Sequence, residues 1–424
     1  MNKNRSIYDP IHKYIEFDPL LISIIDTPEF QRLRYIKQLG ICYFVFSGAS
    51  HNRFEHCLGV SYLCGEMIKS LKSKQEELNI TDRQVILVKI AGLVHDLGHS
   101  CFSHFFDHLF LKNKLNNEDE NINHEYRSGW LFEYIVKKYK LKVTKDECKF
   151  IKKLINPGKN DTGFIFDIVA NKKNGLDCDK FDYIIRDSFN VGLDYSFDPS
   201  RLIKEAYVIN NNICYPDKIA YNIYRLYGTR YDLHKQIYTH PCVHQIEYML
   251  YDAMILVDDE MQISKKVYDP EEFIKLNDNL INLISDNESK SINMIKAKEI
   301  IKNIRTRKLY KMITNLLISK ENIKNISKEL FLDDVIKEED IIITFIFLNY
   351  NMGSCNPVNN IKFYNKNIKN EKGNYKSFNI KKEKVSRLLP IEFEEIYLRI
   401  YCKNNKILDY ANKKINNIIK KLNI

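Results

Sequence analysis

Apolar side chains recur three to five positions apart across residues 53–72, and this spacing predicts an amphipathic helix. The apolar positions are Phe54, Leu58, Leu63, Met67 and Leu71. Arg53 and His56 lie near the start of this helix. The chain therefore places a cation and an imidazole at one end of an element that is buried along one face.

A second helix is predicted to begin after Thr81. Thr81 and Gln84 form a capping-box pattern, in which each side chain accepts a hydrogen bond from the other residue's backbone N–H. Residues 85–94 are almost wholly apolar, so this helix is expected to be buried. It delivers His95 and Asp96 at its carboxyl end.

The segment around Asp179 predicts a third helix. Asp179, Tyr183 and Asp187 are four residues apart, so they would share one helix face. The three predicted helices would thus bring histidine, aspartate and tyrosine side chains from distant parts of the chain to one place.

The pattern changes after about residue 312. Two short runs with high β propensity are separated by polar loops rich in Asn and Gly, a closing helix is expected at the end, and residues 320–340 are polar enough to form a mobile insertion. The β-prone runs are residues 341–347 and 361–364, and the expected closing helix covers residues 391–401. We therefore expect a mainly α fold, with a helical domain over residues 1–312 and a smaller α+β lobe over residues 313–424.

Composition limits the class of protein. A chain of 424 residues that is 44% hydrophobic can bury a large core. The longest apolar run, residues 341–348, is too short to span a bilayer, and Met1 is not followed by an apolar stretch. Ten scattered cysteines without a CxxC pair fit reduced thiols. These features predict an intracellular protein, cytoplasmic or nuclear, with no membrane partner.

The net charge of +10 favours polyanionic partners such as nucleotide phosphates or single-stranded nucleic acid. A solvated surface rich in Lys and Asn explains the same charge equally well, because most of the excess is spread over diffuse Lys, Asn and Ile segments.

Histidines are concentrated in one part of the chain, since seven of the eleven fall between residues 51 and 124. A single histidine after an apolar helix is usually a packed or surface residue. Here, however, two imidazoles and two carboxylates occur together, and such a set suits a divalent first-row metal with positions left open for water and a phosphate oxygen. The four are His56, His95, Asp96 and Asp179. They predict metal-assisted hydrolysis of a phosphate ester.

Other polar residues are placed to serve such a reaction. His104 and Asp107 are one helical turn apart, so the carboxylate would tune a histidine that protonates a leaving oxygen. Arg53 would grip phosphate from the helix face that carries His56, whereas His108 is expected to be a bystander. His99 and His124 supply further imidazoles in the same stretch of the chain. Candidates for contacts to a triphosphate and a sugar are Lys180, Tyr183, Arg230, His234 and Tyr238.

These residues resemble a known family. The set His56, His95-Asp96 and Asp179 is the motif of HD-domain phosphohydrolases, and the surrounding sequence is similar to the sterile-alpha-motif and HD-domain deoxynucleoside triphosphate triphosphohydrolase family. The matching runs are residues 25–40, 48–56 and 385–390, and the likeness covers essentially the whole chain. No sterile-alpha-motif segment precedes the match and no long tail follows it, which predicts an HD-domain catalytic core alone.

The resemblance implies a reaction in which a dNTP and water give a deoxynucleoside and triphosphate. Iron, manganese or zinc would occupy the four-ligand site, and magnesium would accompany the triphosphate. His104 would be the general acid, assisted by His99, Asp107 and His124. Arg53, Lys180, Tyr183 and Arg230 would contact the triphosphate, Gln38 and Asp187 the 3′-hydroxyl, and Leu39, Tyr183 and Tyr238 would exclude a 2′-hydroxyl, with His234 nearby.

The same resemblance implies activation by GTP or dGTP and assembly into a homotetramer. Asp26, Gln31 and Arg34 match the residues that read guanine, and the other matches to activator-binding positions are Arg5, Arg201, Lys218, Asn222, His240, Arg307, Lys311 and Lys382. The chain departs from the family pattern at Ser6, Tyr8, Pro216, Thr239 and Pro241. Because Pro216 and Pro241 replace cations, a second activator site for a dNTP is expected to bind weakly.

Two alternatives use the same residues differently. The first is a nucleotidase or cyclic-nucleotide phosphodiesterase with the same metal site. The second is a non-catalytic protein that senses nucleotides or binds nucleic acid. Gln38, Arg53, Tyr183 and Asp187 favour a deoxynucleoside triphosphate, and the intact metal ligands and His104 favour an enzyme.

Overall fold

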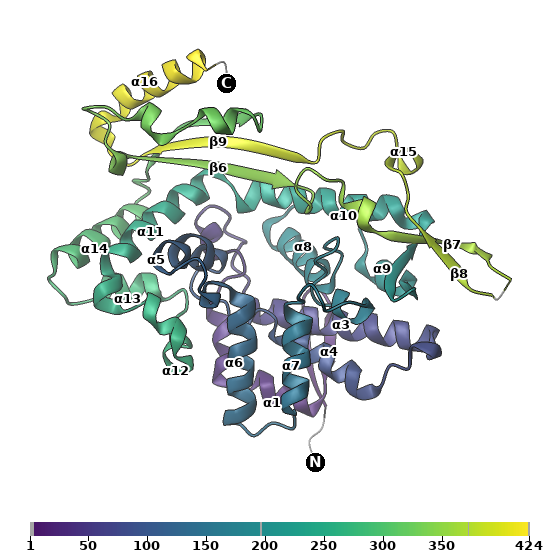
Figure 1. Ribbon diagram of the computed structural model, residues 1–424. Helices are drawn as coiled ribbons and strands as arrows, with labels where there is room; N and C mark the ends of the chain where they lie inside the picture. Colours follow the sequence, from purple (N-terminus) through teal and green to yellow (C-terminus); the bar gives the residue numbers. More distant parts are fainter. Residues whose placement is uncertain (1–3, 196, 372, 423–424) are drawn as a thin grey trace. The chain divides into compact units, whose positions relative to one another are not determined.

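The computed structural model describes residues 4–195, 197–371 and 373–422 (Figure 1). Within these residues helices dominate and the strands form three small sheets, so the predicted mainly α fold is confirmed. The helices are α1 (Pro19–Ile25), α2 (Pro28–Gln31), α3 (Arg53–Lys74), α4 (Asp82–Val94), α5 (Lys112–Lys114), α6 (His124–Lys138), α7 (Lys145–Ile155), α8 (Cys178–Val191), α9 (Pro199–Glu205), α10 (Ala220–Leu233), α11 (Pro241–Met261), α12 (Pro270–Phe273), α13 (Leu280–Asp286), α14 (Ile292–Arg305), α15 (Lys382–Val385) and α16 (Leu408–Lys421). The strands are β1 (Arg5–Asp9), β2 (Lys13–Phe17), β3 (Tyr207–Ile209), β4 (Asn212–Pro216), β5 (Lys311–Ile318), β6 (Ile341–Asn349), β7 (Lys362–Lys369), β8 (Tyr375–Phe378) and β9 (Glu394–Cys402).

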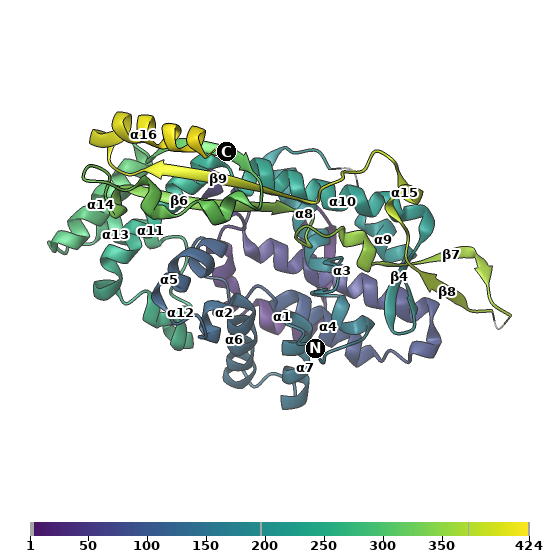
Figure 2. The ribbon, with the colours of Figure 1, turned by 45° about the horizontal axis from the view of Figure 1, so that its top comes forward.

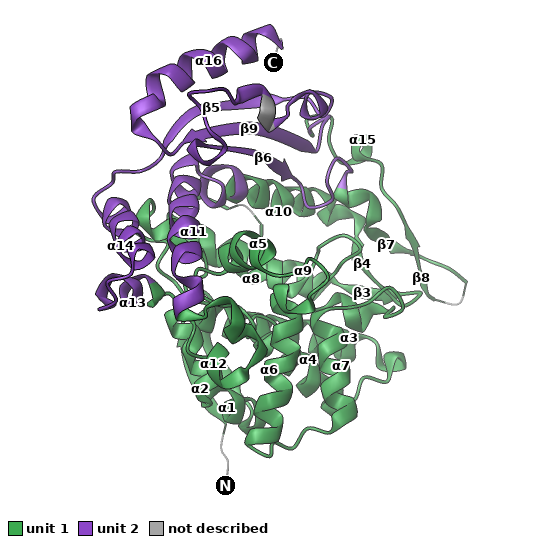
Figure 3. Ribbon diagram, turned by 60° about the vertical axis from the view of Figure 1, so that its left-hand side comes forward, with its two compact units in different colours: residues 1–233, 261–280, 357–389 green, residues 234–260, 281–356, 390–424 purple. Residues whose placement is uncertain are grey.

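The chain forms two compact units, coloured separately in Figure 3. Unit 1 comprises Met1–Leu233, Met261–Leu280 and Pro357–Leu389, and unit 2 comprises His234–Glu260, Ile281–Asn356 and Pro390–Ile424. The chain thus passes between the units several times, whereas the sequence predicts one boundary near residue 312. That boundary between folding domains stays a prediction.

The three helices predicted from the sequence are present in unit 1. The capping box at the start of α4 is formed, with Thr81 Oγ1 accepting from Gln84 N at 3.1 Å and Gln84 Oε1 accepting from Thr81 N at 2.9 Å. Helix α4 packs on α3, which in turn packs on α8. Gly92 permits the close approach of α3 and α4, because a Cβ there would lie 2.9 Å from Cys64 Sγ.

Unit 1 also contains two sheets. Strands β1 and β2 form an N-terminal antiparallel hairpin. The second sheet has the order β3-β4-β7-β8, in which β4 and β7 are parallel and the other neighbours antiparallel. Figure 2 labels β4, β7 and β8 of this sheet. The predicted strand at residues 361–364 corresponds to the start of β7.

Unit 2 contains an antiparallel sheet with the order β5-β9-β6. The prediction of a closing helix over residues 391–401 is wrong, because residues 394–401 belong to β9, the central strand of this sheet. The alternating residues Ile396, Leu398 and Ile400 enter the core, and Tyr401 on the other face is also buried. Burial on both faces gives a nearly continuous apolar run, which has no clear helical or strand period.

The segment from 320 to 340 is part of the core of unit 2. Its apolar residues Ile326, Phe331 and Ile336 are buried beside strands β6 and β9 and helix α16, which is the closing helix of the chain. The expectation of a mobile insertion was based on the many polar residues in this segment and gave too little weight to three well-spaced apolar ones.

Two further expectations from composition can be compared with the structure. No disulfide joins any of the ten cysteines, all of which lie in described residues. No helix within residues 4–195, 197–371 and 373–422 is long and apolar enough to cross a membrane.

Candidate active site and metal centre

Three helix ends position the four predicted metal ligands. His56 lies in the first turn of α3, where Glu55 accepts a hydrogen bond from Asn52 N at 2.8 Å. His95 and Asp96 follow directly after α4. Asp179 lies in the first turn of α8, behind the N-cap residue Asp177. Local capping therefore fixes where the helices that carry His56 and Asp179 begin.

The four side chains converge. Asp179 Oδ1 lies 3.2 Å from His56 Nε2 and 3.4 Å from His95 Nε2. Asp96 presents a different oxygen to each histidine, with Oδ2 3.5 Å from His56 Nε2 and Oδ1 3.4 Å from His95 Nε2. Donor atoms that are each ~2.1 Å from one first-row ion lie roughly 3.0–3.5 Å apart, so this spacing fits a single metal ion.

The unpaired nitrogens of both histidines also fit a metal. His95 Nδ1 lies 2.8 Å from Gly92 O, an acceptor only, so Nδ1 carries the proton and Nε2 keeps a lone pair. His56 Nδ1 lies 2.8 Å from Asp182 Oδ2, which has the same effect. In the part of the chain that the structure describes, both Nε2 atoms are buried and have no hydrogen-bond partner. A buried lone pair without a donor is what a bound cation would satisfy.

The charges of the site also favour a bound cation. Burial disfavours a charged His56, but the carboxylates of Asp179 and Asp182 beside it outweigh this effect and raise the pKa of His56 to about 10. Despite its burial, Asp179 has a pKa well below its usual range because His56 and His95 lie beside it. The carboxylates thus favour positive charge at this point, and a divalent cation would provide it.

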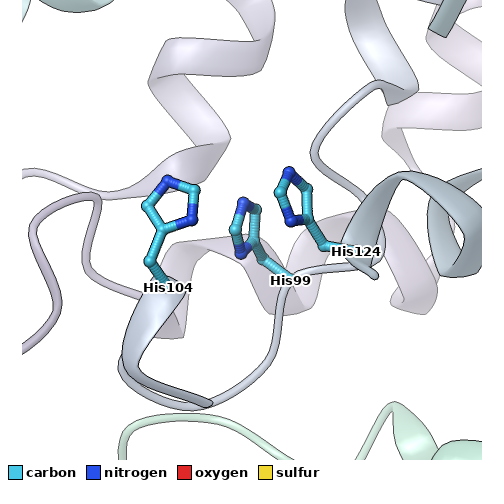
Figure 4. Close-up of side chains that lie close together, drawn as sticks. All are labelled: His99, His104 and His124. Carbon is cyan, nitrogen blue, oxygen red and sulfur yellow. The ribbon is translucent and has the colours of Figure 1, made fainter. Parts of the chain in front are cut away.

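A second group of histidines lies next to the metal ligands. His99 Nε2 is 3.5 Å from Asp96 Oδ1, and Figure 4 shows the ring of His99 between those of His104 and His124. The rings of His99 and His124 stack with centroids 3.8 Å apart, and the ring of His104 meets His99 edge-on at 4.9 Å. The structure therefore brings together the three histidines that the sequence analysis singled out.

Asp107 serves a different histidine from the one expected. It accepts a hydrogen bond from His124 Nδ1 at 2.9 Å and pairs with the buried Arg127, and none of the hydrogen bonds found among the described residues joins it to His104. Phe102 and Ser103 have positive φ angles and residues 106–111 form a π-helical turn, so the α-helical spacing assumed for His104 and Asp107 does not apply. Asp107 influences His104 through its charge alone.

His104 is held in its neutral form in the free protein. Its imidazole remains accessible to solvent, but enclosure by protein lowers its pKa, and the nearby Arg53, His124 and His108 lower it further. A bound polyanion would oppose those cations and raise the pKa again. The site therefore suits a histidine that becomes a proton donor only when phosphate is present.

Arg53 links the metal ligands to the neighbouring loop. Its guanidinium is buried, pairs with Asp96, donates to Ser103 Oγ at 2.8 Å and reaches Gln38 O at 3.4 Å. Gln38 itself is buried, and its side-chain Oε1 has no hydrogen-bond partner among the described residues. Arg53, which is expected to bind phosphate, therefore lies next to Gln38, which is expected to bind the sugar.

Helix α8 carries more of the expected substrate residues. Asp187 is buried and lies 2.7 Å from His51 Nε2, while Lys180 Nζ lies 3.2 Å from Asp177. Tyr183 is close enough to Lys180 and Arg230 for their charges to act on its hydroxyl, although burial dominates and raises its pKa. Leu39 is half-buried just before residues 40–44, and His234 and Tyr238 in unit 2 form an edge-on ring pair with centroids 4.9 Å apart. The substrate roles of these residues stay predictions.

Four of the expected activator residues surround one cavity in unit 1. The cavity measures about 500 Å³ and is lined by Arg5, Ile7, Ile25, Asp26, Gln31, Arg34 and Phe54. Arg5 pairs with Asp26 through contacts of 2.6 and 3.1 Å, Arg34 Nε donates to Gln31 Oε1 at 2.8 Å, and the Arg34 guanidinium stacks 3.5 Å above the ring of Phe54. We refer to this space as the N-terminal cavity.

The other expected activator residues lie elsewhere. Arg201 contacts Asn222 at 3.5 Å, and Lys218 lies 3.5 Å from Glu205. Lys382 begins α15 in unit 1. In unit 2, Arg307 contacts Cys242, His240 directly precedes α11 and Lys311 begins β5. Their role at an activator also stays a prediction.

Asp278 and Asp182 hold this site together and were not among the residues predicted from the sequence. Asp278 accepts from Phe102 N at 2.6 Å and from Lys37 N at 2.7 Å, so it joins the loop of His104 to the loop of Gln38. Burial raises the pKa of Asp278 to about 7. No local signal marks this residue, because its partners lie far away in the sequence. Asp182 could have been found, since it follows Asp179 by one turn on α8.

Comparison with known proteins gives the same picture. Residues 53–155, which include α3, α4 and the histidine group, match the model of the HD domain family. The chain is 39% identical to the deoxynucleoside triphosphate triphosphohydrolase SAMHD1 homolog of Dictyostelium discoideum, over 99% of this chain and 82% of that protein. It is 38% identical to deoxynucleoside triphosphate triphosphohydrolase SAMHD1 of Homo sapiens, over 94% of this chain and 70% of that protein. An HD domain-containing protein of Acanthamoeba polyphaga mimivirus is 36% identical over 97% of this chain and 95% of its own length.

The fold and the histidine–aspartate centre thus define an HD-domain protein. Within that class, the chain belongs to the SAMHD1 family of deoxynucleoside triphosphate triphosphohydrolases.

Proposed function

We propose that this protein hydrolyses a dNTP to a deoxynucleoside and inorganic triphosphate, with one metal ion held by His56, His95, Asp96 and Asp179. The observation that carries the proposal is the convergence of these four donors beside Arg53 and the His99–His104–His124 group. The relatives named for this activity support the choice of substrate. Iron, manganese or zinc fits the donor set, and magnesium would neutralise charge on the triphosphate.

When bound, the metal would supply Lewis-acid polarisation of the α-phosphate. Arg53, fixed by Asp96 and Ser103, would bind phosphate oxygens from the side of the metal ligands. As water attacks the α-phosphorus, the bond from phosphorus to the 5′-oxygen breaks, and His104 would donate a proton to that oxygen. Asp107 would hold His124 and, through the stacked ring of His99, keep the group ordered.

One assay tests the reaction and separates it from its alternatives. Purified protein is incubated with each dNTP and NTP, with and without GTP, and the products are separated as nucleoside, monophosphate and triphosphate. Deoxynucleoside and intact triphosphate are expected as the first products. Release of pyrophosphate or orthophosphate first would instead indicate a nucleotidase or phosphodiesterase, and absence of hydrolysis with any nucleotide would reject the enzymatic function.

Tyr183 is expected to select the deoxyribose sugar. Removing its ring opens space where a 2′-hydroxyl would otherwise clash, so Tyr183→Ala should lower the ratio of kcat/KM for dNTPs over NTPs by about 10-fold or more. The matched control is Phe189→Ala on the same helix, whose ring is 59% exposed to solvent. Discrimination that is the same in Tyr183→Ala, Phe189→Ala and wild type would place the sugar gate elsewhere.

A guanine nucleotide is the proposed ligand of the N-terminal cavity. Asp26 can accept two hydrogen bonds from a guanine edge, and its side chain is 51% exposed in its pair with Arg5. Gln31 and Arg34 would complete the recognition, since both line the same cavity. We propose that GTP or dGTP bound here promotes a homotetramer and raises activity, whereas a second activator site would bind dNTP weakly because Pro216 and Pro241 carry no charge.

Adding GTP to a dilute sample should therefore shift the mass measured by light scattering from monomer or dimer towards tetramer and raise activity in parallel, because a ligand that binds one state better shifts the population to it. Asp26→Ala and Arg34→Ala should lose both responses. Asp146→Ala, which removes an acid that is 93% exposed, is the control. Full activity in a stable monomer, or assembly that ignores GTP, would contradict the assignment.

A further inference from the structure

A buried carboxylate, Asp182, lies directly behind the metal ligand His56. Its Oδ2 is 2.8 Å from His56 Nδ1 and 2.8 Å from Arg186 Nε, and its Oδ1 is 2.6 Å from His12 Nε2 and 2.9 Å from Arg186 Nη2. Four donors thus fill the four acceptor positions of one carboxylate that has no solvent exposure. Asp182 accepts from His56 Nδ1–H, and this hydrogen bond leaves the lone pair of His56 on Nε2, the atom that faces the metal ligands.

The backbone is shaped to admit this group. Gly59 lies on α3 one turn after His56, and a Cβ at this position would overlap both Asp182 Oδ1 and the guanidinium of Arg186. Only glycine lets α8 bring the carboxylate and the guanidinium so close to α3. The hydrogen bonds of Asp182 and Arg186 are therefore part of the packing between α3 and α8.

The fourth donor comes from the N-terminal hairpin. His12 lies in the turn between β1 and β2, and its side chain is 7% exposed. Asp9 fixes that turn by accepting from Ile11 N at 2.9 Å and from His12 N at 2.8 Å, and it pairs with Arg186 at 2.8 Å. Two residues of the hairpin therefore reach the carboxylate that orients His56, one directly and one through Arg186.

We propose that Asp182 and His12 are positioning residues of the metal centre, and that the metal centre depends on the N-terminal hairpin for its assembly. The inference rests on the proposed metal site and extends it to residues that touch no metal. Strand β1 also carries Arg5 and Ile7 of the N-terminal cavity. The N-terminal hairpin thus lines the cavity and also supports the proposed metal ligand His56.

The test is a Co²⁺ titration of the full chain after removal of metal by a chelator, followed by the visible absorption of the bound ion. A matched pair of variants isolates the hydrogen bond from His12. His12→Gln keeps an N–H donor at the distance of His Nε2, whereas His12→Asn is too short to reach Asp182. Because loss of a residue that orients a metal ligand weakens binding by about 10- to 100-fold, His12→Asn should bind Co²⁺ less tightly by that factor and His12→Gln should recover most of it.

Two further variants complete the design. Asp182→Asn should weaken Co²⁺ binding and change the absorption spectrum, because an amide presented to His56 Nδ1 permits the tautomer that protonates Nε2. Tyr14→Ala, on the same hairpin with its ring 74% exposed, should bind Co²⁺ as wild type does. Equal affinities for His12→Asn and His12→Gln, or a normal affinity and spectrum in Asp182→Asn, would overturn the inference.

The outcomes also separate this inference from the proposed function. If wild type binds Co²⁺ and the variants behave as expected but no dNTP is hydrolysed, the function is rejected and the positioning network stands. If dNTPs are hydrolysed but the His12 pair is indistinguishable, the network is rejected and the function stands. A wild-type chain that binds no Co²⁺ overturns the metal assignment and this inference together.

Discussion

Replacing both His95 and Asp96 by alanine is expected to reduce dNTP hydrolysis below detection while the chain stays folded. The double variant removes two of the four proposed donors, in which each histidine Nε2 lies within 3.5 Å of both carboxylates, so the metal should be lost as well. Product analysis measures the activity, elemental analysis the bound metal, and circular dichroism with thermal unfolding the fold.

Asp96 also pairs with the buried Arg53, and removing one partner of a buried ion pair typically costs ~3–5 kcal/mol of stability. The single variant Asp96→Asn serves as a control for this effect, because it keeps an acceptor oxygen for Arg53 while it removes the charge from the metal site. We expect Asp96→Asn to unfold near the wild-type temperature and still to be severely impaired. Near-normal turnover with metal retained in either variant would show that the catalytic centre lies elsewhere.

His104→Ala is expected to lower kcat by on the order of 100-fold or more, with a smaller effect on KM, because the proton for the departing 5′-oxygen is lost. His108→Ala is the matched control, since the two imidazoles stack with centroids 5.4 Å apart and only His104 is assigned to the reaction. The metal content of both variants should equal that of wild type.

The pH dependence of kcat provides a second measure of the same role. The free protein holds the pKa of His104 below its ordinary value, by enclosure first and then by the charges of Arg53, His124 and His108. Bound triphosphate would raise this pKa, because its negative charge opposes those cations, and a general acid must be protonated to act. Activity should therefore fall as pH rises through the pKa of His104 in the enzyme–substrate complex, and His104→Ala should lack that limb. Unchanged kcat and an unchanged pH profile would assign proton donation to another group.

Local sequence was sufficient to predict the helices that carry the proposed metal ligands. The Thr81–Gln84 capping box begins α4 where predicted, and the apolar run after it ends at His95. The four-residue spacing of Asp179, Tyr183 and Asp187 likewise matches α8. These features depend on hydrogen bonds and side-chain periods within one helix, so they can be read from adjacent residues.

The strand β9 could not be predicted from its local sequence. Its residues have the apolar content of a buried helix, and only their pairing with β5 and β6 makes them a strand. The same limit applies to Asp107, which a regular helix would place beside His104 but which contacts His124 and Arg127 because the chain makes two positive-φ residues and a π-helical turn. In both cases the local structure depends on contacts with residues elsewhere in the chain, and the local spacing of apolar residues does not reveal these contacts.

The sequence by itself thus determined the class of protein and predicted a metal site, because two histidines and two aspartates at predicted helix ends are the donor set of an HD domain. Only the tertiary structure decided how those donors are held. Asp182 and His12 are 170 residues apart, and Asp278 lies 176 residues from the loop it fixes. Contacts between such distant residues arise from the packing of whole helices and loops, and a buried carboxylate reveals its partners only when the chain has folded around it.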